Sequence, residues 1–207
     1  MKFFSPPNQL TFLRILLTPV FLVFLFSPYP TMRQWSLVVF ILAAITDWYD
    51  GWVARRWGYV TRWGTFFDPF ADKVVTSAAL IAYIYLGLVA GWMVWIIVIR
   101  DGIITLLRSY AEYKGKPVET SKLAKIKTFV QFVIIYYLLI LYVAQNTPSL
   151  CENYSELIHT LLNYSLVYSM MIVVTALTLW TGISHLIVNW KTIQELYDSS
   201  DKTAQAD

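Results

Sequence analysis

The chain has 207 residues, of which 57% are hydrophobic and 14% are charged. A water-soluble domain of this size could not bury that much apolar surface in one core, whereas lipid can surround long apolar helices. The net charge of +3 excludes a general polyanion binder, and the single cysteine, Cys151, excludes an intrachain disulfide and a cysteine-based metal cage.

Six apolar stretches follow one another along the chain and predict an all-α membrane protein. Each is about as long as a helix that crosses the hydrocarbon core, which needs about 20 residues. The first is expected to be retained, because Arg14 interrupts it and no small-residue cleavage site follows. One transmembrane domain over residues 1–190 is expected, with a polar cytoplasmic tail over 191–207. The predicted spans are 9–27, 32–53, 66–89, 91–113, 123–144 and 161–190.

Positively charged residues indicate how these spans are oriented. Lysine and arginine concentrate after the second and fourth spans, whereas the loop after the first has only Arg33 and a predicted loop over 147–156 has neither. Cytoplasmic loops are rich in such residues, so both termini are expected in the cytoplasm and the chain in the inner (cytoplasmic) membrane. The cytoplasmic loops would carry Arg55, Arg56, Arg62, Lys114, Lys116, Lys122, Lys125 and Lys127.

Four aspartates at the ends of two apolar spans are the strongest chemical signal. Asp47 and Asp50 lie near the end of the second span, and Asp68 and Asp72 lie at the start of the third. Spacings of three and four place each pair on one helix face, and a short cytoplasmic turn over 51–67 is expected to bring the pairs together. Adjacent carboxylates need a compensating cation, and Mg²⁺ or Mn²⁺ suits their oxygens. Zinc has less support, because both histidines are distant in sequence.

Simpler explanations exist for parts of this group. Asp68 could cap a helix that begins at Pro69, with the other aspartates as solvated helix-end charges, but this explains one aspartate of the four. Gly51 and Gly64 would allow either phosphates or neighbouring helices to approach the backbone. Arg55 has donors suited to a diphosphate, and positive-inside anchoring would also account for it.

The complete arrangement has a spacing that is hard to attribute to chance. Residues 47–55 are DWYDGWVAR, eight residues follow, and residues 64–72 are GTFFDPFAD. This is similar to the signature of the CDP-alcohol phosphotransferase family, D-x2-D-G-x2-A-R-x8-G-x3-D-x3-D, at every fixed position. The resemblance implies an enzyme that displaces CMP from a CDP-linked lipid with an alcohol, uses two divalent cations and works as a homodimer.

The same resemblance implies roles for individual residues. Asp47, Asp50 and Asp68 would be chiefly metal ligands, whereas Asp72 would be a metal ligand and also the general base for the incoming hydroxyl. The CDP-lipid would be bound by Asp50, Gly51, Ala54, Arg55, Gly64 and Asp68.

Three other segments bear on the acceptor alcohol. The N-terminal segment with Asn8, Thr11 and Arg14 is similar to that of bacterial family members that make phosphatidylglycerol phosphate, as are segments 100–108 and 121–131. Two positions depart from this pattern, because Asp101 replaces the usual Glu and Ala124 the usual Gly.

Positive charge in these segments favours a phosphorylated acceptor. A cationic pocket beside the aspartates would hold the acceptor's phosphate and direct its free hydroxyl inward. Positive-inside bias is the alternative explanation for the lysines, whereas an arginine deep in an apolar run favours a functional role. The predicted acceptor-phosphate residues are Arg100, Arg108, Lys125 and Lys127.

Together these features predict transfer of the phosphatidyl group of CDP-diacylglycerol to sn-glycerol 3-phosphate, giving phosphatidylglycerol phosphate and CMP. The acyl tails would stay among the membrane lipids while the acceptor enters from the cytoplasm. A CDP-diacylglycerol-dependent cardiolipin synthase, or another CDP-alcohol phosphotransferase, is the nearest alternative. A divalent-cation transporter is an alternative of a different class, because intramembrane carboxylates also line ion paths. A structural membrane subunit would leave the motif unexplained.

Overall fold

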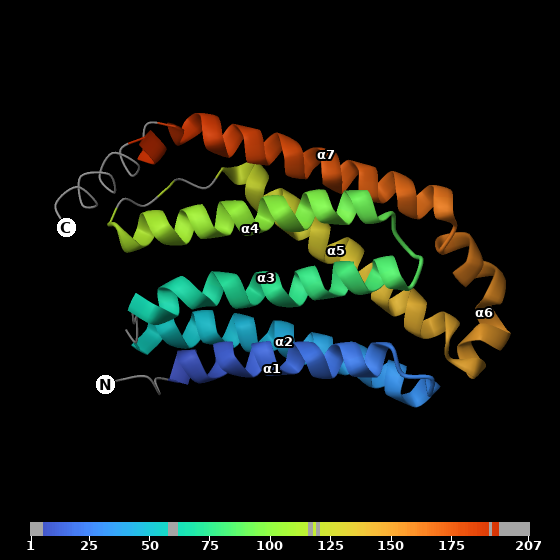
Figure 1. Cartoon of the computed structure of the whole chain (residues 1–207). Coiled ribbons are helices and arrows are strands. Elements are labelled where there is room, and N and C mark those ends of the chain that lie inside the picture. Colours follow the sequence, from blue (N-terminus) through green and yellow to red (C-terminus); the bar gives the residue numbers. More distant parts are fainter. Residues whose placement is uncertain (1–5, 58–61, 116–117, 119–120, 191, 195–207) are drawn as a thin grey trace.

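The described part of the chain forms a bundle of seven helices and contains no strand (Figure 1). This computed structural model describes residues 6–57, 62–115, 118, 121–190 and 192–194, and for 6–11, 47, 48, 50–57 and 62–69 it describes the backbone alone. The helices are α1 (Pro6–Leu25), α2 (Pro30–Trp57), α3 (Arg62–Tyr85), α4 (Gly91–Tyr113), α5 (Lys122–Gln145), α6 (Pro148–Leu161) and α7 (Tyr164–Val188).

The six long helices alternate in direction along the bundle (Figure 1). The shortest of them, α1, has 20 residues and is therefore about 30 Å long. α1 begins and α7 ends at the same end of the bundle, where α2 also leads to α3 and α4 leads to α5. We call this the aspartate end, because the four signature aspartates lie in the parts of α2 and α3 nearest to it. The opposite end carries α6 and the links α1–α2 and α3–α4.

The surface of the bundle is consistent with a membrane protein. Within the described residues, α5 and α7 are long and apolar enough to cross a bilayer, and Phe12–Leu25 and Pro30–Thr46 are shorter apolar helical stretches. Large apolar side chains face outward on several helices, including Trp95, Phe129 and Ile183, which are 51%, 69% and 58% exposed. Water-soluble proteins rarely expose apolar side chains on this scale.

The loop predicted over 147–156 is wrong. Pro148–Leu161 forms α6, a helix of 14 residues with non-helical backbone at Tyr154. Its sequence, PSLCENYSELIHTL, lacks the long apolar run by which the other helices are recognised. The last long helix, α7, consequently runs from Tyr164 to Val188 rather than over 161–190.

The turn predicted between the two aspartate pairs is also wrong. α2 continues to Trp57 and α3 begins at Arg62, so that only residues 58–61, which are not among the described residues, separate them. Asp68 therefore lies within α3 instead of capping a helix that begins at Pro69. Gly51 lies within α2, although a glycine inside a helix costs about 1 kcal/mol relative to alanine.

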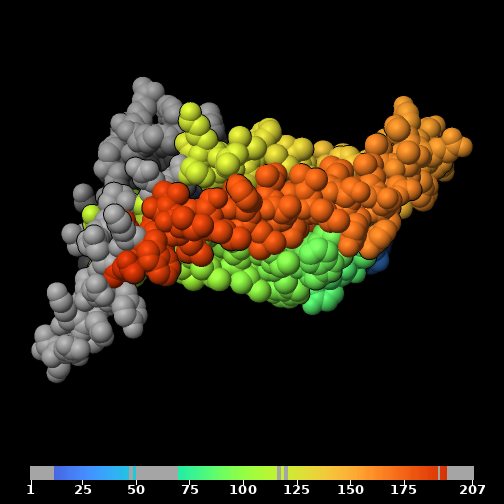
Figure 2. All heavy atoms as spheres, turned by 90° about the horizontal axis from the view of Figure 1, so that it is seen from above, coloured from blue at the N-terminus to red at the C-terminus, as the bar shows by residue number. Residues whose placement is uncertain are grey.

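Aromatic packing holds the long helices beside one another. Phe40 of α2 packs against Phe21 of α1 and Tyr136 of α5, with ring centroids 5.1 and 5.2 Å away. Tyr83 of α3 is fully buried and donates its hydroxyl to the carbonyl oxygen of Ile135 on α5 at 2.8 Å. On the other side of the bundle, α7 lies across α4 and α5 (Figure 2).

Candidate active site

The signature aspartates lie on two helices joined by a short link. Asp47 lies ten residues before α2 ends, and Asp72 lies ten residues after α3 begins. Asp50 and Asp68 lie seven and six residues from the same helix ends. A link of four residues keeps those ends close, so the aspartates fall at matching levels about 10 to 15 Å into the helices.

Asp72 lines a cavity of about 150 Å³ that α1, α2, α3 and α5 enclose. Arg14 of α1 lies in the same wall and is only 2% exposed. Thr76 follows one turn after Asp72 and donates its hydroxyl to the carbonyl oxygens of Asp72 and Lys73, both at 3.2 Å. A carboxylate and a guanidinium therefore lie in the wall of one cavity. Its other lining residues are Phe40, Ala43, Ala44, Val75 and Phe132.

The donor chemistry of the signature fits a hard divalent cation, because carboxylate oxygens are the ligands that Mg²⁺ and Mn²⁺ prefer. The one signature carboxylate whose side chain is described, that of Asp72, lines a cavity rather than the outer surface. The side chains of the remaining predicted metal and CDP-lipid ligands lie outside the described residues. These are Asp47, Asp50, Gly51, Ala54, Arg55, Gly64 and Asp68, all within the facing ends of α2 and α3.

A second polar centre lies inside the bundle around Asp101 of α4. The Lys127 ammonium from α5 donates to both carboxylate oxygens of Asp101, at 2.6 and 2.7 Å. Arg100 donates to the same carboxylate through Nη1 at 3.0 Å. Lys127 and Asp101 are buried, with exposed side-chain fractions of 1% and 3%. The structure thus brings two of the four predicted acceptor-phosphate residues together through a carboxylate.

Lys73 connects the polar centre around Asp101 with the signature aspartates. Its ammonium nitrogen lies 3.7 Å from Oδ2 of Asp101, and Lys73 directly follows Asp72 in α3. We call the group of Lys73, Arg100, Asp101 and Lys127 the Asp101 cluster. The sequence prediction missed Lys73, although a lysine beside the last signature aspartate in an apolar span was a usable signal.

Arg100 is also held by α7. Its Nη2 donates to Thr181 Oγ1 at 3.0 Å, and its aliphatic part lies against Gly182. A Cβ added at Gly182 would lie 3.1 Å from Arg100 Cγ and Nε, which is tighter than ordinary contact. Gly182 is therefore needed here for close approach of the arginine.

The other predicted acceptor residues are not part of this cluster. Arg108 and Lys125 are exposed, in the parts of α4 and α5 that lie toward the aspartate end. Asn8 and Thr11 lie in α1, and their side chains are outside the described residues.

His185 of α7 is a buried polar residue that the sequence prediction assigned no role. It is 6% exposed, and neither ring nitrogen has a hydrogen-bond partner among the described residues. It lies one turn after Thr181, the partner of Arg100. This histidine would be accessible to a ligand only from inside the bundle.

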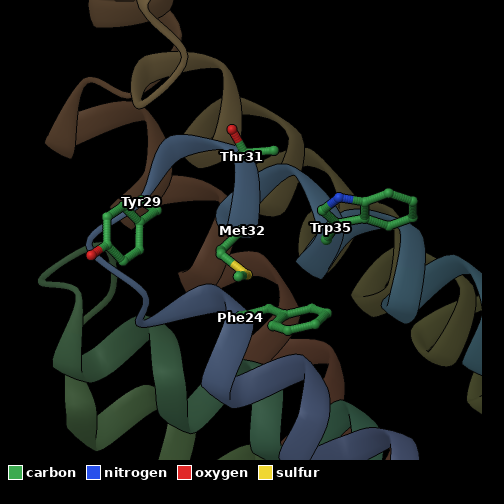
Figure 3. A pocket seen from close by; sticks show the side chains of 5 residues that line it. All are labelled: Phe24, Tyr29, Thr31, Met32 and Trp35. Atoms are coloured by element: carbon green, nitrogen blue, oxygen red, sulfur yellow. The ribbon is translucent and has the colours of Figure 1, made fainter.

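A larger apolar hollow, of about 660 Å³, lies at the opposite end of the bundle (Figure 3). Phe24, Tyr29, Thr31, Met32 and Trp35 line it, around the link between α1 and α2. Its wall contains no charged side chain, so it lacks the groups needed to bind a phosphate. The signature aspartates and the polar centre around Asp101 remain the candidate active site.

Comparison with known proteins agrees with this site. Residues 4–188 match the family described as CDP-alcohol phosphatidyltransferase. The chain belongs to this family. The matched region contains all seven described helices and both charged centres. The protein is therefore a phosphatidyltransferase enzyme. The alternative of a cation transporter does not account for this match.

Several similar proteins of this family carry the name CDP-diacylglycerol–glycerol-3-phosphate 3-phosphatidyltransferase. One from Bacillus subtilis (strain 168) is 36% identical over 149 residues, covering 66% of this chain and 77% of that protein. One from Salmonella typhimurium is 32% identical over 189 residues, covering 88% and 93%. One from Escherichia coli (strain K12) is 31% identical over 189 residues with the same coverage, 88% and 93%.

Proposed function

We propose that this phosphatidyltransferase moves the phosphatidyl group of CDP-diacylglycerol to sn-glycerol 3-phosphate, with phosphatidylglycerol phosphate and CMP as products. The observation that carries the proposal is the Asp101 cluster, whose member Lys73 directly follows Asp72 in α3. Three cations face one carboxylate there, which leaves a net formal charge of +2 inside the bundle. The names of the similar proteins support the same two substrates.

The excess positive charge suits a phosphorylated acceptor. Arg100 and Lys127 would hold the phosphate of glycerol 3-phosphate, because charge-assisted hydrogen bonds to phosphate are short and strong. Lys73 would contribute from the side of Asp72, which places the free hydroxyl of a short acceptor near that aspartate. Exposed Arg108 and Lys125 would attract the acceptor at the cytoplasmic entrance.

Asp72 would accept the proton of the attacking hydroxyl. A positioned general base contributes about 10²- to 10⁴-fold to a rate. Two Mg²⁺ or Mn²⁺ ions, held by Asp47, Asp50, Asp68 and Asp72, would neutralise the diphosphate and the charge that develops on CMP. Arg14 lies in the wall of the same cavity as Asp72 and would contribute positive charge there.

The arrangement in the membrane is part of the proposal. The lysines and arginines that flank the links α2–α3 and α4–α5 belong to the aspartate end, which would therefore face the cytoplasm, together with both termini. Six long helices would span the inner membrane, and the acyl chains of the substrate would stay in the surrounding lipid. Contacts between two copies of the chain, as a homodimer, would cover part of the exposed apolar surface.

The decisive experiment uses protein purified in detergent or lipid, CDP-diacylglycerol and a panel of alcohols, with CMP release as the readout. Glycerol 3-phosphate should be used in strong preference to glycerol, inositol and serine. Preference for phosphatidylglycerol would instead identify a cardiolipin synthase, and preference for an uncharged alcohol would refute the role of the Asp101 cluster in acceptor selection.

A further inference from the structure

The Asp101 carboxylate is the common partner of three cations from three helices. Lys127 of α5, Arg100 of α4 and Lys73 of α3 lie 2.6, 3.0 and 3.7 Å from its oxygens. Asp101 itself is 3% exposed, so its carboxylate is almost entirely shielded from water. A buried carboxylate with this many partners determines where each of them lies.

The bonds to Asp101 leave donors of the cations for another ligand. Lys127 has three N–H donors, of which the two short bonds to Asp101 use two. Arg100 is held by Asp101 and Thr181 through Nη1 and Nη2, while its buried Nε has no partner. Together with the net positive charge, these donors create a site for an anion that none of the described residues supplies.

We infer that Asp101 is a positioning residue for the acceptor's phosphate. It does not touch the acceptor, but it fixes Lys127 and Arg100 so that their remaining donors converge on one anion. This inference rests on the proposed function, because the anion is taken to be the phosphate of glycerol 3-phosphate. Without the carboxylate, mutual repulsion would separate the three cations and draw the long Lys127 side chain toward the cytoplasmic surface.

A purely structural role for Asp101 makes a different prediction. If the carboxylate only neutralised buried charge, its loss would lower stability and the amount of active enzyme, and the two KM values would stay unchanged or rise together. A positioning role acts selectively on the acceptor, because a phosphate-binding group contributes equally to the ground state and the transition state and its loss appears in KM.

The test compares Asp101→Asn and Asp101→Glu with Thr105→Val. Thr105 lies one turn further along α4 and is also buried, and it provides the matched control. Asp101→Asn should raise the KM for glycerol 3-phosphate by about 10-fold or more and change the KM for CDP-diacylglycerol by less than about twofold. Asp101→Glu, which keeps the charge, should recover most of the acceptor affinity. Thr105→Val should leave both constants unchanged.

A double replacement connects the effect to Lys127. In a Lys127→Met background the further change Asp101→Asn should raise the KM for glycerol 3-phosphate by a smaller factor than in the parent, because only the part that acts through Arg100 remains. Equal factors in the two backgrounds would overturn the inference. If Asp101→Asn alone does not fold, the double variant is compared with Lys127→Met, because it removes both members of the buried ion pair. A rise in the KM for CDP-diacylglycerol as large as that for glycerol 3-phosphate would then overturn the inference.

Two kinds of failure are distinguishable. A parent protein that releases CMP with another alcohol, and not with glycerol 3-phosphate, refutes the proposed function. A parent protein that uses glycerol 3-phosphate, while Asp101→Asn leaves its KM unchanged or raises both KM values equally without rescue by Glu, refutes the role of Asp101.

Discussion

Lys127 and Asp101 form a buried two-bond contact, with Nζ 2.6 and 2.7 Å from the two carboxylate oxygens, and this contact joins α5 to α4 inside the bundle. An exposed lysine at the same end of α5 would suffice for anchoring at a membrane surface. The burial of Lys127 therefore favours a role in the reaction over the positive-inside explanation.

Replacement of Lys127 by Met should weaken acceptor binding and leave the CDP-lipid site intact. Loss of a charged hydrogen bond costs about 1.5 to 3 kcal/mol, so the KM for glycerol 3-phosphate should rise by about 10- to 100-fold. Asp101 would keep Lys73 and Arg100 as partners, which should preserve the fold. Steady-state kinetics with both substrates measures this, with the exposed Lys122→Met as control. Equal effects on both KM values would contradict the assignment.

Removal of divalent cations should abolish CMP release, and Mg²⁺ or Mn²⁺ should restore it, because four carboxylates without zinc-type partners suit hard cations. Asp47→Asn should raise the cation concentration needed for half-maximal activity by about 10-fold or more. A titration of activity against free Mg²⁺ measures the shift. Full turnover in excess chelator would refute the metal site.

Asp72→Asn should separate catalysis from binding. If Asp72 is the general base, kcat should fall by about 10²- to 10⁴-fold while affinity for CDP-diacylglycerol and metal changes little. Single-turnover rates and lipid binding should be measured on the same preparation. Collapse of binding together with the rate would make Asp72 chiefly a metal ligand, and the base would have to be another group.

Gly182→Ala should disturb the acceptor site through Arg100. The added methyl group would lie 3.1 Å from Arg100 Cγ and Nε, so the arginine would have to move. The KM for glycerol 3-phosphate should rise by roughly 3- to 10-fold without a matching change for CDP-diacylglycerol. Gly102→Ala is the matched control, because no neighbouring atom lies within 4 Å of the Cβ that it would add. If Gly182→Ala and Gly102→Ala change the KM for glycerol 3-phosphate to the same extent, the contact between Gly182 and Arg100 has no role in acceptor binding.

Much of the aspartate end was predictable from spacing. The motif pairs Asp47 and Asp50 with Asp68 and Asp72 across a short connection, and long apolar runs predict the helices that carry them. The apolar runs could not show that α2 and α3 continue almost to the link, because Gly51 and Pro69 are residues that usually break helices. The sequence did not predict α6, because the polar sequence of this helix resembles that of a loop.

The Asp101 cluster was only partly predictable. A tight turn at Gly87 would place Lys73 opposite Asp101, because each lies fourteen residues from it, so this contact had a signal in the sequence. The contact between Asp101 and Lys127 had no such signal in the sequence. α5 is inclined to α4 in the bundle, and that inclination depends on side-chain packing along both helices (Figure 1).

The turn at Gly87 determines which residues of α3 lie opposite which residues of α4. Gly87 has φ +71°, and the amide of Leu88 donates to the carbonyl oxygen of Tyr83 at 3.0 Å, which ends α3 abruptly. One residue inserted there could slide α3 along α4 by up to about 3.5 Å. Such a slide is comparable with the 3.7 Å that separates Lys73 from Asp101. A length change about 20 Å away could therefore misalign Asp72 and Lys73 with Asp101 while the side chains of the site remained unchanged.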